Sequence, residues 1–187
     1  MAGKEIYHKM KDKVKDAFSS SGPETGKGKT KLSGKRVKHG YHLVKGKSNH
    51  PMEDYLVAEY RQEGEHDLGL FAIFDGHLGH TVPDFLRSHL FDNILKQEMY
   101  RVLMLAVARA FGDRSLKKHL SSEPDVVEEP IDENTDFLIL ASDGLWKAVD
   151  EIKDFKDAQA AAKHLTEQAV NRKSKDDISC IVVKFLC

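Results

Sequence analysis

The sequence predicts an α+β domain in which strands come first and last and helices lie between them. The clearest strand signals are two apolar runs, 68–74 and 137–142, which end in the turn pairs Asp75-Gly76 and Asp143-Gly144. A short apolar run that stops at an Asp-Gly pair is typical of a buried strand. Strands and helices that succeed one another in this way favour a layered fold.

Four further segments are predicted to be strands because they are rich in β-branched, aromatic and other apolar residues. They are 41–44, 55–60, 125–128 and 178–186. The polar stretch 62–67 is predicted to be the turn that joins the second of these strands to the run ending at Asp75.

Three segments are predicted to be helices. In 78–96 the apolar residues fall on one side, and Pro83 suits a first helical turn. The segment 155–171 is rich in alanine and is also expected to be helical. A short amphipathic helix is expected at 4–18, where the apolar residues Ile6, Met10, Val14 and Phe18 recur on one face.

Length and composition predict a soluble protein with one core. The chain has 187 residues, of which 40% are hydrophobic and 32% are charged. No apolar run approaches the ~20 residues that a membrane-spanning helix needs, and the N-terminus lacks the apolar core of a signal peptide. The two cysteines, Cys180 and Cys187, indicate a reducing compartment. We therefore expect the cytoplasm or the nucleus.

Charge divides the chain into a basic arm and an acidic body. Residues 1–47 hold 13 Lys and Arg against 4 Asp and Glu. The Gly/Ser/Lys-rich stretch 19–34 is predicted to be a flexible linker, so 1–35 is predicted to be a basic flexible arm and 36–187 the folded domain. Such an arm can contact nucleic acid, anionic lipid or an acidic partner, or it can be a solvated tail. Because no aromatic residue interleaves 27–38, nucleic-acid binding is not expected.

Acidic residues stand at the ends of four predicted strands. Asp75 and Asp143 follow two of them, and the pairs Glu53-Asp54 and Asp176-Asp177 precede two others. Any single Asp-Gly is explained as a turn. Four acidic positions at strand ends can converge on one edge of a sheet, where carboxylates repel one another unless hard cations lie between them. The pattern therefore predicts a metal site.

Five motifs follow one another along the chain. They are Pro51-Met-Glu53-Asp54, Phe74-Asp75-Gly76-His77-Leu-Gly79, Leu105-Ala-Val-Ala-Arg-Ala-Phe-Gly-Asp113, Ser142-Asp143-Gly144-Leu-Trp146 and Lys175-Asp176-Asp177-Ile-Ser179. With these motifs the chain, from about His39 to its end, resembles the metal-dependent protein serine/threonine phosphatases of type 2C in a plant-like form.

The resemblance implies an antiparallel β-sandwich flanked by helices, in α-β-β-α layers, with two Mg²⁺ or Mn²⁺ ions at one end. Asp75 would bridge the ions, Glu53 with or without Asp54 would serve one of them, and Asp143 and Asp176 the other. The backbone carbonyl of Gly76 would contribute as well. Such ions prefer oxygen ligands, and two of them can activate a shared water for attack on phosphorus. Strand alternation lets only one of Asp176 and Asp177 face the site, and the family pattern favours Asp176.

The resemblance also implies phosphorylated proteins as substrates and gives roles to two other residues. His77 would protonate the departing Ser or Thr oxygen, because an imidazole titrates near neutrality. Lys47 is the candidate cation for the substrate phosphate, where the family commonly has arginine, and a solvated lysine is the alternative. We expect a monomer.

The chain departs from the family in its middle. Gln97 is joined to Leu105 by seven unfamiliar residues, where the family carries several more strands. An internal deletion near 97–105, from alternative splicing or an incorrectly drawn gene model, is therefore predicted, and the sandwich is expected to be incomplete. Two alternatives to a phosphatase remain: an interaction or decoy protein without turnover, and a tether that acts through the basic arm.

Overall fold

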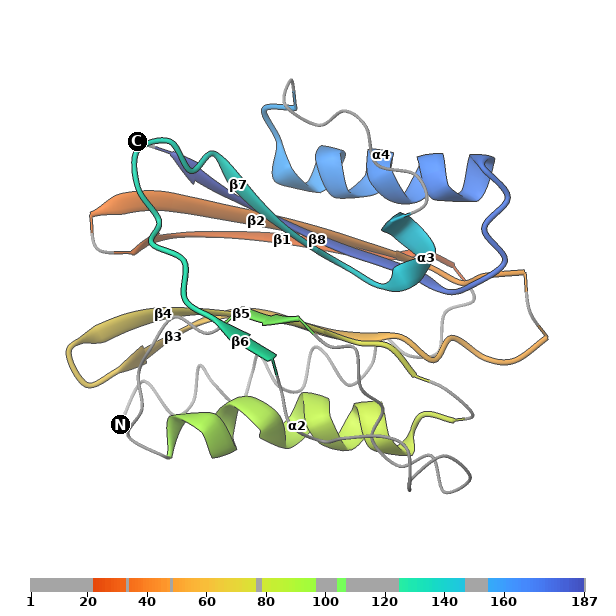
Figure 1. Ribbon diagram of the computed structural model, residues 1–187, viewed down its shortest axis with the longest axis horizontal. Helices are drawn as coiled ribbons and strands as arrows, with labels where there is room; N and C mark the ends of the chain where they lie inside the picture. The colour runs from red at the N-terminus through yellow and green to blue at the C-terminus, as the bar shows by residue number, and fades with distance from the viewer. Residues whose placement is uncertain are drawn as a thin grey trace.

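The computed structural model describes residues 22–32, 34–47, 49–76, 79–96, 104–106, 125–146 and 155–186. Two antiparallel sheets lie face to face, with one long helix outside each, so that the layers run α-β-β-α (Figure 1). The predicted α+β fold class is confirmed. The predicted helix at 4–18 and the segments 97–103 and 107–124 lie outside the described residues.

The first sheet, sheet I, has four strands in the order β1-β2-β8-β7. These strands are β1 (Glu24–Leu32), β2 (Lys35–Val44), β8 (Ile178–Leu186) and β7 (Phe137–Ala141). The helix α4 (Ala158–Asn171) packs on its outer face and presents small residues such as Ala162 to the sheet. Its first turn is capped by Asp157, whose carboxylate accepts a hydrogen bond from the Ala160 N–H at 2.9 Å.

The second sheet, sheet II, is the hairpin of β3 (Tyr55–Glu63) and β4 (His66–Phe74), and α2 (Thr81–Leu95) covers its outer face. Two short strands, β5 (Met104–Ala106) and β6 (Asp125–Val127), pair with each other, and the single turn α3 (Asp143–Trp146) follows β7. Among the described residues, sheet II therefore has half as many strands as sheet I.

The central strand β8 explains why the last predicted strand reads as an almost continuous apolar run. Ile178, Cys180 and Val182 belong to the core beneath α4. Ile181 and Val183 face the other way and pack against residues of sheet II such as Phe71. Because both faces of β8 are buried, the alternation of polar and apolar residues that marks a half-buried strand is lost.

The predicted flexible linker is wrong for residues 24–32, because they form β1. Their side chains alternate between solvent and the sheet interior, and β1 pairs with β2 along its whole length. Two of the glycines make room for aromatic rings of β2: a Cβ atom on Gly28 would lie 2.5 Å from His39 Cε1. The folded domain therefore begins before Arg36. None of the helices in the described part of the chain has the length and apolar character of a membrane span.

A buried histidine lies between the two sheets. His39 is 5% exposed, and its Nδ1 lies 3.0 Å from the Tyr60 hydroxyl oxygen. The rings of Tyr60 and Phe71 pack against the imidazole at 5.2 and 5.3 Å between centroids. Burial lowers the pKa of His39 to about 4.

We predict that His39 makes the fold less stable in mild acid. The pKa of His39 is about 6.5 in the unfolded chain. Between pH 6.5 and 4 the imidazole is therefore protonated in the unfolded state but stays neutral in the folded state. The free energy of unfolding should therefore fall between pH 6.5 and 4, by about 3 kcal/mol in total. Urea unfolding at a series of pH values should show this slope reduced in His39→Phe.

Comparing the original chain with His39→Phe separates the effect of His39 on the free energy of unfolding from that of the other titrating groups. Burial also lowers the pKa of His42, which acts in the same direction, whereas the raised pKa values of Asp54 and Asp75 act in the opposite direction. All three groups are present in both proteins. An identical pH dependence in the two would contradict the prediction.

Candidate metal centre

The segments that carry the predicted ligands meet at one end of the two sheets. The pairs Val44↔Ile178 and Ala141↔Cys180 place the end of β2, the start of β8 and the end of β7 together in sheet I. The pair Tyr55↔Phe74 does the same for the start of β3 and the end of β4 in sheet II. Antiparallel pairing thus gathers acidic positions that lie far apart in the sequence.

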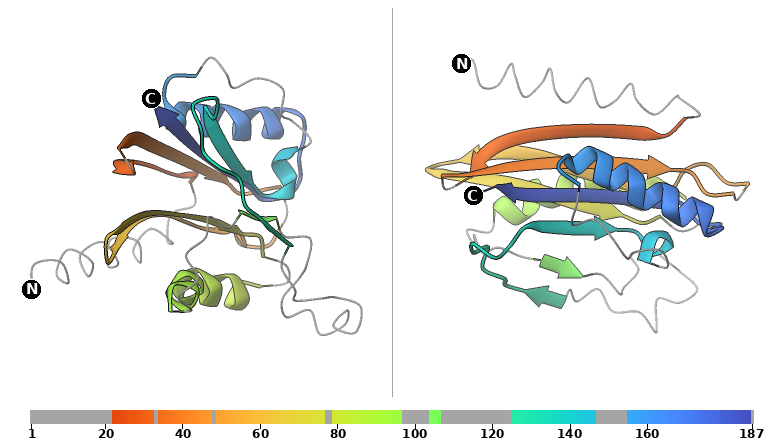
Figure 2. Two further views of the ribbon diagram at one scale, coloured as in Figure 1. Left: turned by 60° about the vertical axis from the view of Figure 1, so that its left-hand side comes forward. Right: turned by 90° about the horizontal axis from the view of Figure 1, so that it is seen from above.

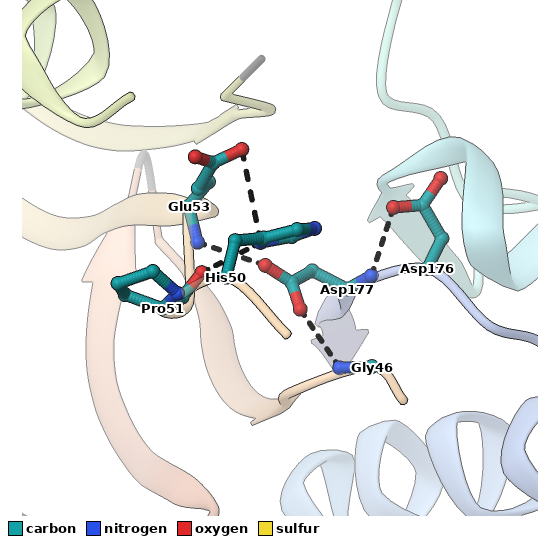
Figure 3. A network of polar contacts seen from close by, with 6 residues as sticks. All are labelled: Gly46, His50, Pro51, Glu53, Asp176 and Asp177. Atoms are coloured by element: carbon teal, nitrogen blue, oxygen red, sulfur yellow. Dashed lines mark hydrogen bonds and ion pairs between the residues drawn. The ribbon is translucent and has the colours of Figure 1, made fainter. Parts of the chain in front are cut away.

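Asp177 ties these segments together. It is 3% exposed, and its two carboxylate oxygens accept hydrogen bonds from the Gly46 N–H at 2.7 Å and the Glu53 N–H at 2.8 Å (Figure 3). The connection from β2 to β3 is thereby attached to the start of β8. A carboxylate that accepts two backbone N–H groups is a strong, charge-assisted clamp.

Beneath this clamp lies a second polar group, centred on Asp54. This residue is 2% exposed, and its carboxylate accepts a hydrogen bond from the Ser179 hydroxyl at 2.7 Å. Ser142 joins β7 to the same group, because its hydroxyl oxygen accepts a hydrogen bond from the Ser179 N–H at 2.9 Å. Burial, with the negative charge of Asp75 adding to it, raises the pKa of Asp54 to about 7.

Three glycines allow the surrounding loops to touch. A Cβ atom on Gly76 would lie 2.4 Å from the Glu53 carbonyl oxygen, and one on Gly46 would lie 2.4 Å from the Lys175 carbonyl oxygen. One on Gly144 would lie 2.8 Å from the Asp177 carbonyl oxygen. Any side chain at these positions would push the loops apart, so the glycines set the spacing of the acidic residues.

Three carboxylates from three different elements interact at the open side of this end. Asp75 follows β4, Asp143 begins α3 and Asp176 precedes β8, and all three are exposed. The Asp143 N–H donates a hydrogen bond to the Asp75 carboxylate. Desolvation by the surrounding loops, together with the negative charges of Asp143 and Asp176, raises the pKa of Asp75 to about 6. The carboxylates therefore repel one another.

This donor set fits hard divalent cations in its chemistry. It consists of carboxylate oxygens, and the repulsion that raises the pKa of Asp75 is what a bound cation would relieve. Within the described ranges, however, no three or more His, Cys, Asp or Glu side chains are grouped closely enough to hold a metal ion. Glu53 is half-buried at the edge of the cluster, 3.8 Å from His50 Nδ1.

The structure places most of the predicted site residues, but not all of them. Gly76 lies against Glu53, and the charges of Asp143 and Asp176 act on Asp75. Lys47 is exposed at the rim, where its N–H donates to the Lys175 carbonyl oxygen at 3.1 Å. His77 lies outside the described residues.

The roles of Asp177, Ser142 and Ser179 were not predicted from the sequence. Asp177 entered only as the alternative to Asp176, whereas the structure makes it the residue that holds the loops. Asp177 accepts backbone N–H groups, and both Asp176 and Asp177 add negative charge at Asp75, so the choice of Asp176 as a ligand stays a prediction. A signal for the serines was present in the Ser-Asp-Gly and Asp-Asp-Ile-Ser motifs.

Comparison with known proteins matches this chain to one family. The model of the family "Protein phosphatase 2C" matches residues 96–178. The chain is 62% identical, over 290 positions and the full length of both proteins, to "Probable protein phosphatase 2C 62" of Oryza sativa subsp. japonica.

Two proteins of Arabidopsis thaliana are similar at lower identity. "Probable protein phosphatase 2C 58" is 40% identical over 285 positions, and "Probable protein phosphatase 2C 39" is 41% identical over 289 positions. Both alignments cover 99% of this chain and 100% of the relative. All three alignments run over more positions than the 187 residues of this chain.

We predict that Asp177→Ala destabilises the fold strongly. The substitution leaves the Gly46 and Glu53 N–H groups without their acceptor, and each charge-assisted hydrogen bond is worth roughly 1.5–3 kcal/mol. The free energy of unfolding should fall by about 3 kcal/mol or more. Asp177→Asn keeps the shape and one acceptor oxygen, so it should lose about half as much. Equal losses in urea unfolding of the two variants would argue against the clamp.

Proposed function

Because the chain belongs to the protein phosphatase 2C family, we propose that it is a metal-dependent phosphatase that hydrolyses phosphoserine and phosphothreonine in phosphorylated proteins. The observation that carries this proposal is the convergence of carboxylates at one end of the two sheets, where the Asp143 N–H donates to Asp75 and Asp176 adds its charge. Phosphoryl transfer needs concentrated positive charge, and a cluster of repelling carboxylates is suited to attract it.

In this proposal Asp75, Asp143 and Asp176, with Glu53 and Asp54, would hold two Mg²⁺ or Mn²⁺ ions. Such ions, when bound, neutralise the cluster and supply an activated water for attack on phosphorus. Asp177 and Ser179 act as positioning residues, because they fix the loop of Glu53 and the side chain of Asp54. The hydrogen bond from Asp143 to Asp75 orients the Asp75 carboxylate.

Two residues at the rim would handle the substrate. Lys47, exposed beside the loop that carries Asp176, is our candidate for a contact with the substrate phosphate. His77 follows Asp75-Gly76 in the sequence and is our candidate to protonate the departing oxygen.

A non-catalytic relative is the second candidate function. It is supported by the two strands of sheet II in the described part of the chain and by alignments with relatives that run over 290 positions against 187 residues here. These observations support the internal deletion expected near 97–105. A chain that lacks strands around its site can keep the ligand residues and yet lose the sub-ångström placement that turnover demands.

We predict that Asp75→Asn abolishes both activity and stabilisation by metal. Mn²⁺ that binds only the folded state should raise the free energy of unfolding by about 2.7 kcal/mol at a hundred times its Kd. Without Mn²⁺ the variant should melt no lower than the original protein, because it removes a charge from a repelling cluster. Hydrolysis of p-nitrophenyl phosphate should fall to background, a larger loss than the roughly 10–100-fold that removing an outer-shell partner costs.

Asp67→Asn provides a matched control, since Asp67 is exposed in the hairpin at the other end of sheet II. This substitution should change neither the hydrolysis of p-nitrophenyl phosphate nor the stabilisation by Mn²⁺. A metal-induced shift of the melting temperature without hydrolysis, lost in Asp75→Asn, would favour the non-catalytic relative. If Mn²⁺ does not stabilise the protein at all, the metal site and the phosphatase proposal both fail.

A further inference from the structure

Five basic side chains form a strip on the outer face of sheet I, and the active-site proposal uses none of them. The basic strip consists of the exposed residues Lys27, Lys29, Lys31, Arg36 and Lys38. The register pairs Lys29 with Lys38 and Lys31 with Arg36 across β1 and β2. Directly opposed residues of an antiparallel pair point to the same side, so the five cations share one face.

The helix α4 leaves this strip uncovered. From above, α4 lies over β2 and β8 near one end of sheet I, and the tip of the β1–β2 hairpin extends beyond it (Figure 2). The Gln159 side chain, at the start of α4, donates a hydrogen bond to the Thr25 hydroxyl oxygen at 2.7 Å. This contact lies on β1 just before the first residue of the basic strip, Lys27. No described acidic side chain forms an ion pair with any member of the strip.

The strip opposes the stability of the hairpin. Like charges placed directly opposite each other destabilise a strand pair, and here two such pairs stand side by side. Lysines on an edge strand can serve to discourage pairing with other chains. That role accounts for the lysines of β1, which is the edge of sheet I, but not for Arg36 and Lys38 on the inner strand β2.

The shape of the strip points to an extended chain as its ligand. Alternate residues of a strand lie about 6.8 Å apart on one face, and the same spacing separates alternate side chains of an extended partner. The strip contains no aromatic ring for base stacking and no apolar side chain to enter a bilayer. Among the described strands, β1 pairs only with β2, and none of them pairs with its other edge.

The chain's own acidic segment does not fill this role. Residues 128–136 meet the sheet at Lys35, whose ammonium group donates to the carbonyl oxygens of Ile131 and Asp132. Lys35 and Arg36 are neighbours on β2 and therefore point to opposite faces. The acidic segment is thus held away from the strip.

We propose that the basic strip binds an extended acidic segment of a partner protein, which adds as a strand to the free edge of β1. The partner's backbone pairs with β1, and its alternating carboxylates lie beside Lys27, Lys29 and Lys31. This function is separate from hydrolysis, because the strip lies on the outer face of sheet I and not at the end where the acidic loops meet.

The test measures binding of a labelled peptide of alternating Glu and Thr to the full chain by fluorescence anisotropy, without metal. Its outcome is therefore independent of phosphatase activity. The triple variant Lys27→Gln, Lys29→Gln, Lys31→Gln should bind about tenfold more weakly or worse, since each exposed pair contributes roughly 0.5 kcal/mol. A thermal melt verifies that the variant is folded.

A second triple variant, Lys96→Gln, Lys163→Gln, Lys173→Asn, changes the net charge equally at exposed sites outside the strip. Asn is used at Lys173 because that residue has a φ of 67°. It should bind the peptide almost as tightly as the original chain. If both triple variants bind the peptide equally weakly, binding depends on net charge and not on the basic strip, and the proposal is overturned.

Three further ligands test the identity of the partner. A peptide of alternating Glu and Pro has the same charge but lacks the N–H groups that strand pairing needs, so it should bind about tenfold more weakly. Single-stranded DNA and vesicles containing phosphatidylserine should bind more weakly than the Glu-Thr peptide. Tighter binding of either, equal binding of the two peptides, or no binding of the Glu-Thr peptide would each overturn the proposal.

Discussion

The candidate site depends on one buried carboxylate, that of Asp177. Its two oxygens accept the N–H groups of Gly46 and Glu53, and so join the connection between β2 and β3 to the first residues of β8. Sheet I and sheet II have their own pairing registers, and they share a core that includes Ile181 of β8 and Phe71 of β4. Neither register by itself determines where Glu53 lies relative to Asp176, and the clamp fixes the Glu53 backbone beside Asp177.

The clamp matters because the residues that it places repel one another. Asp75, Asp143 and Asp176 lie close enough that their charges raise the pKa of Asp75, and Asp54 is buried with a raised pKa behind them. Hydrogen bonds from backbone N–H groups and serine hydroxyls hold this arrangement together. The fold therefore maintains an unfavourable concentration of negative charge at this end of the two sheets.

The sequence allowed the prediction of elements whose signals are local. The helix α4 and the strand β8 were found nearly to their ends, because alanine content and a run of apolar residues are visible within one segment. The strand β1 was missed because its glycines suggested flexibility, whereas Gly28 accommodates the ring of His39 from the neighbouring strand. The role of Asp177 was not foreseen either, since its partners lie more than a hundred residues earlier in the chain. Composition cannot reveal contacts of this range.

The placement of the site residues in the sequence explains how an internally shortened chain could keep them. Glu53, Asp54 and Asp75 come from sheet II and its loops, and Asp143 and Asp176 from sheet I, so they lie on either side of the segment 97–124. A deletion between the two groups would spare every candidate ligand. It would remove strands from the sheets that support them, and two strands alone bury little apolar surface. Ligand identity and catalytic competence are therefore separable in this chain, because the first is set by a few loop residues and the second by the rigidity of the sheets behind them.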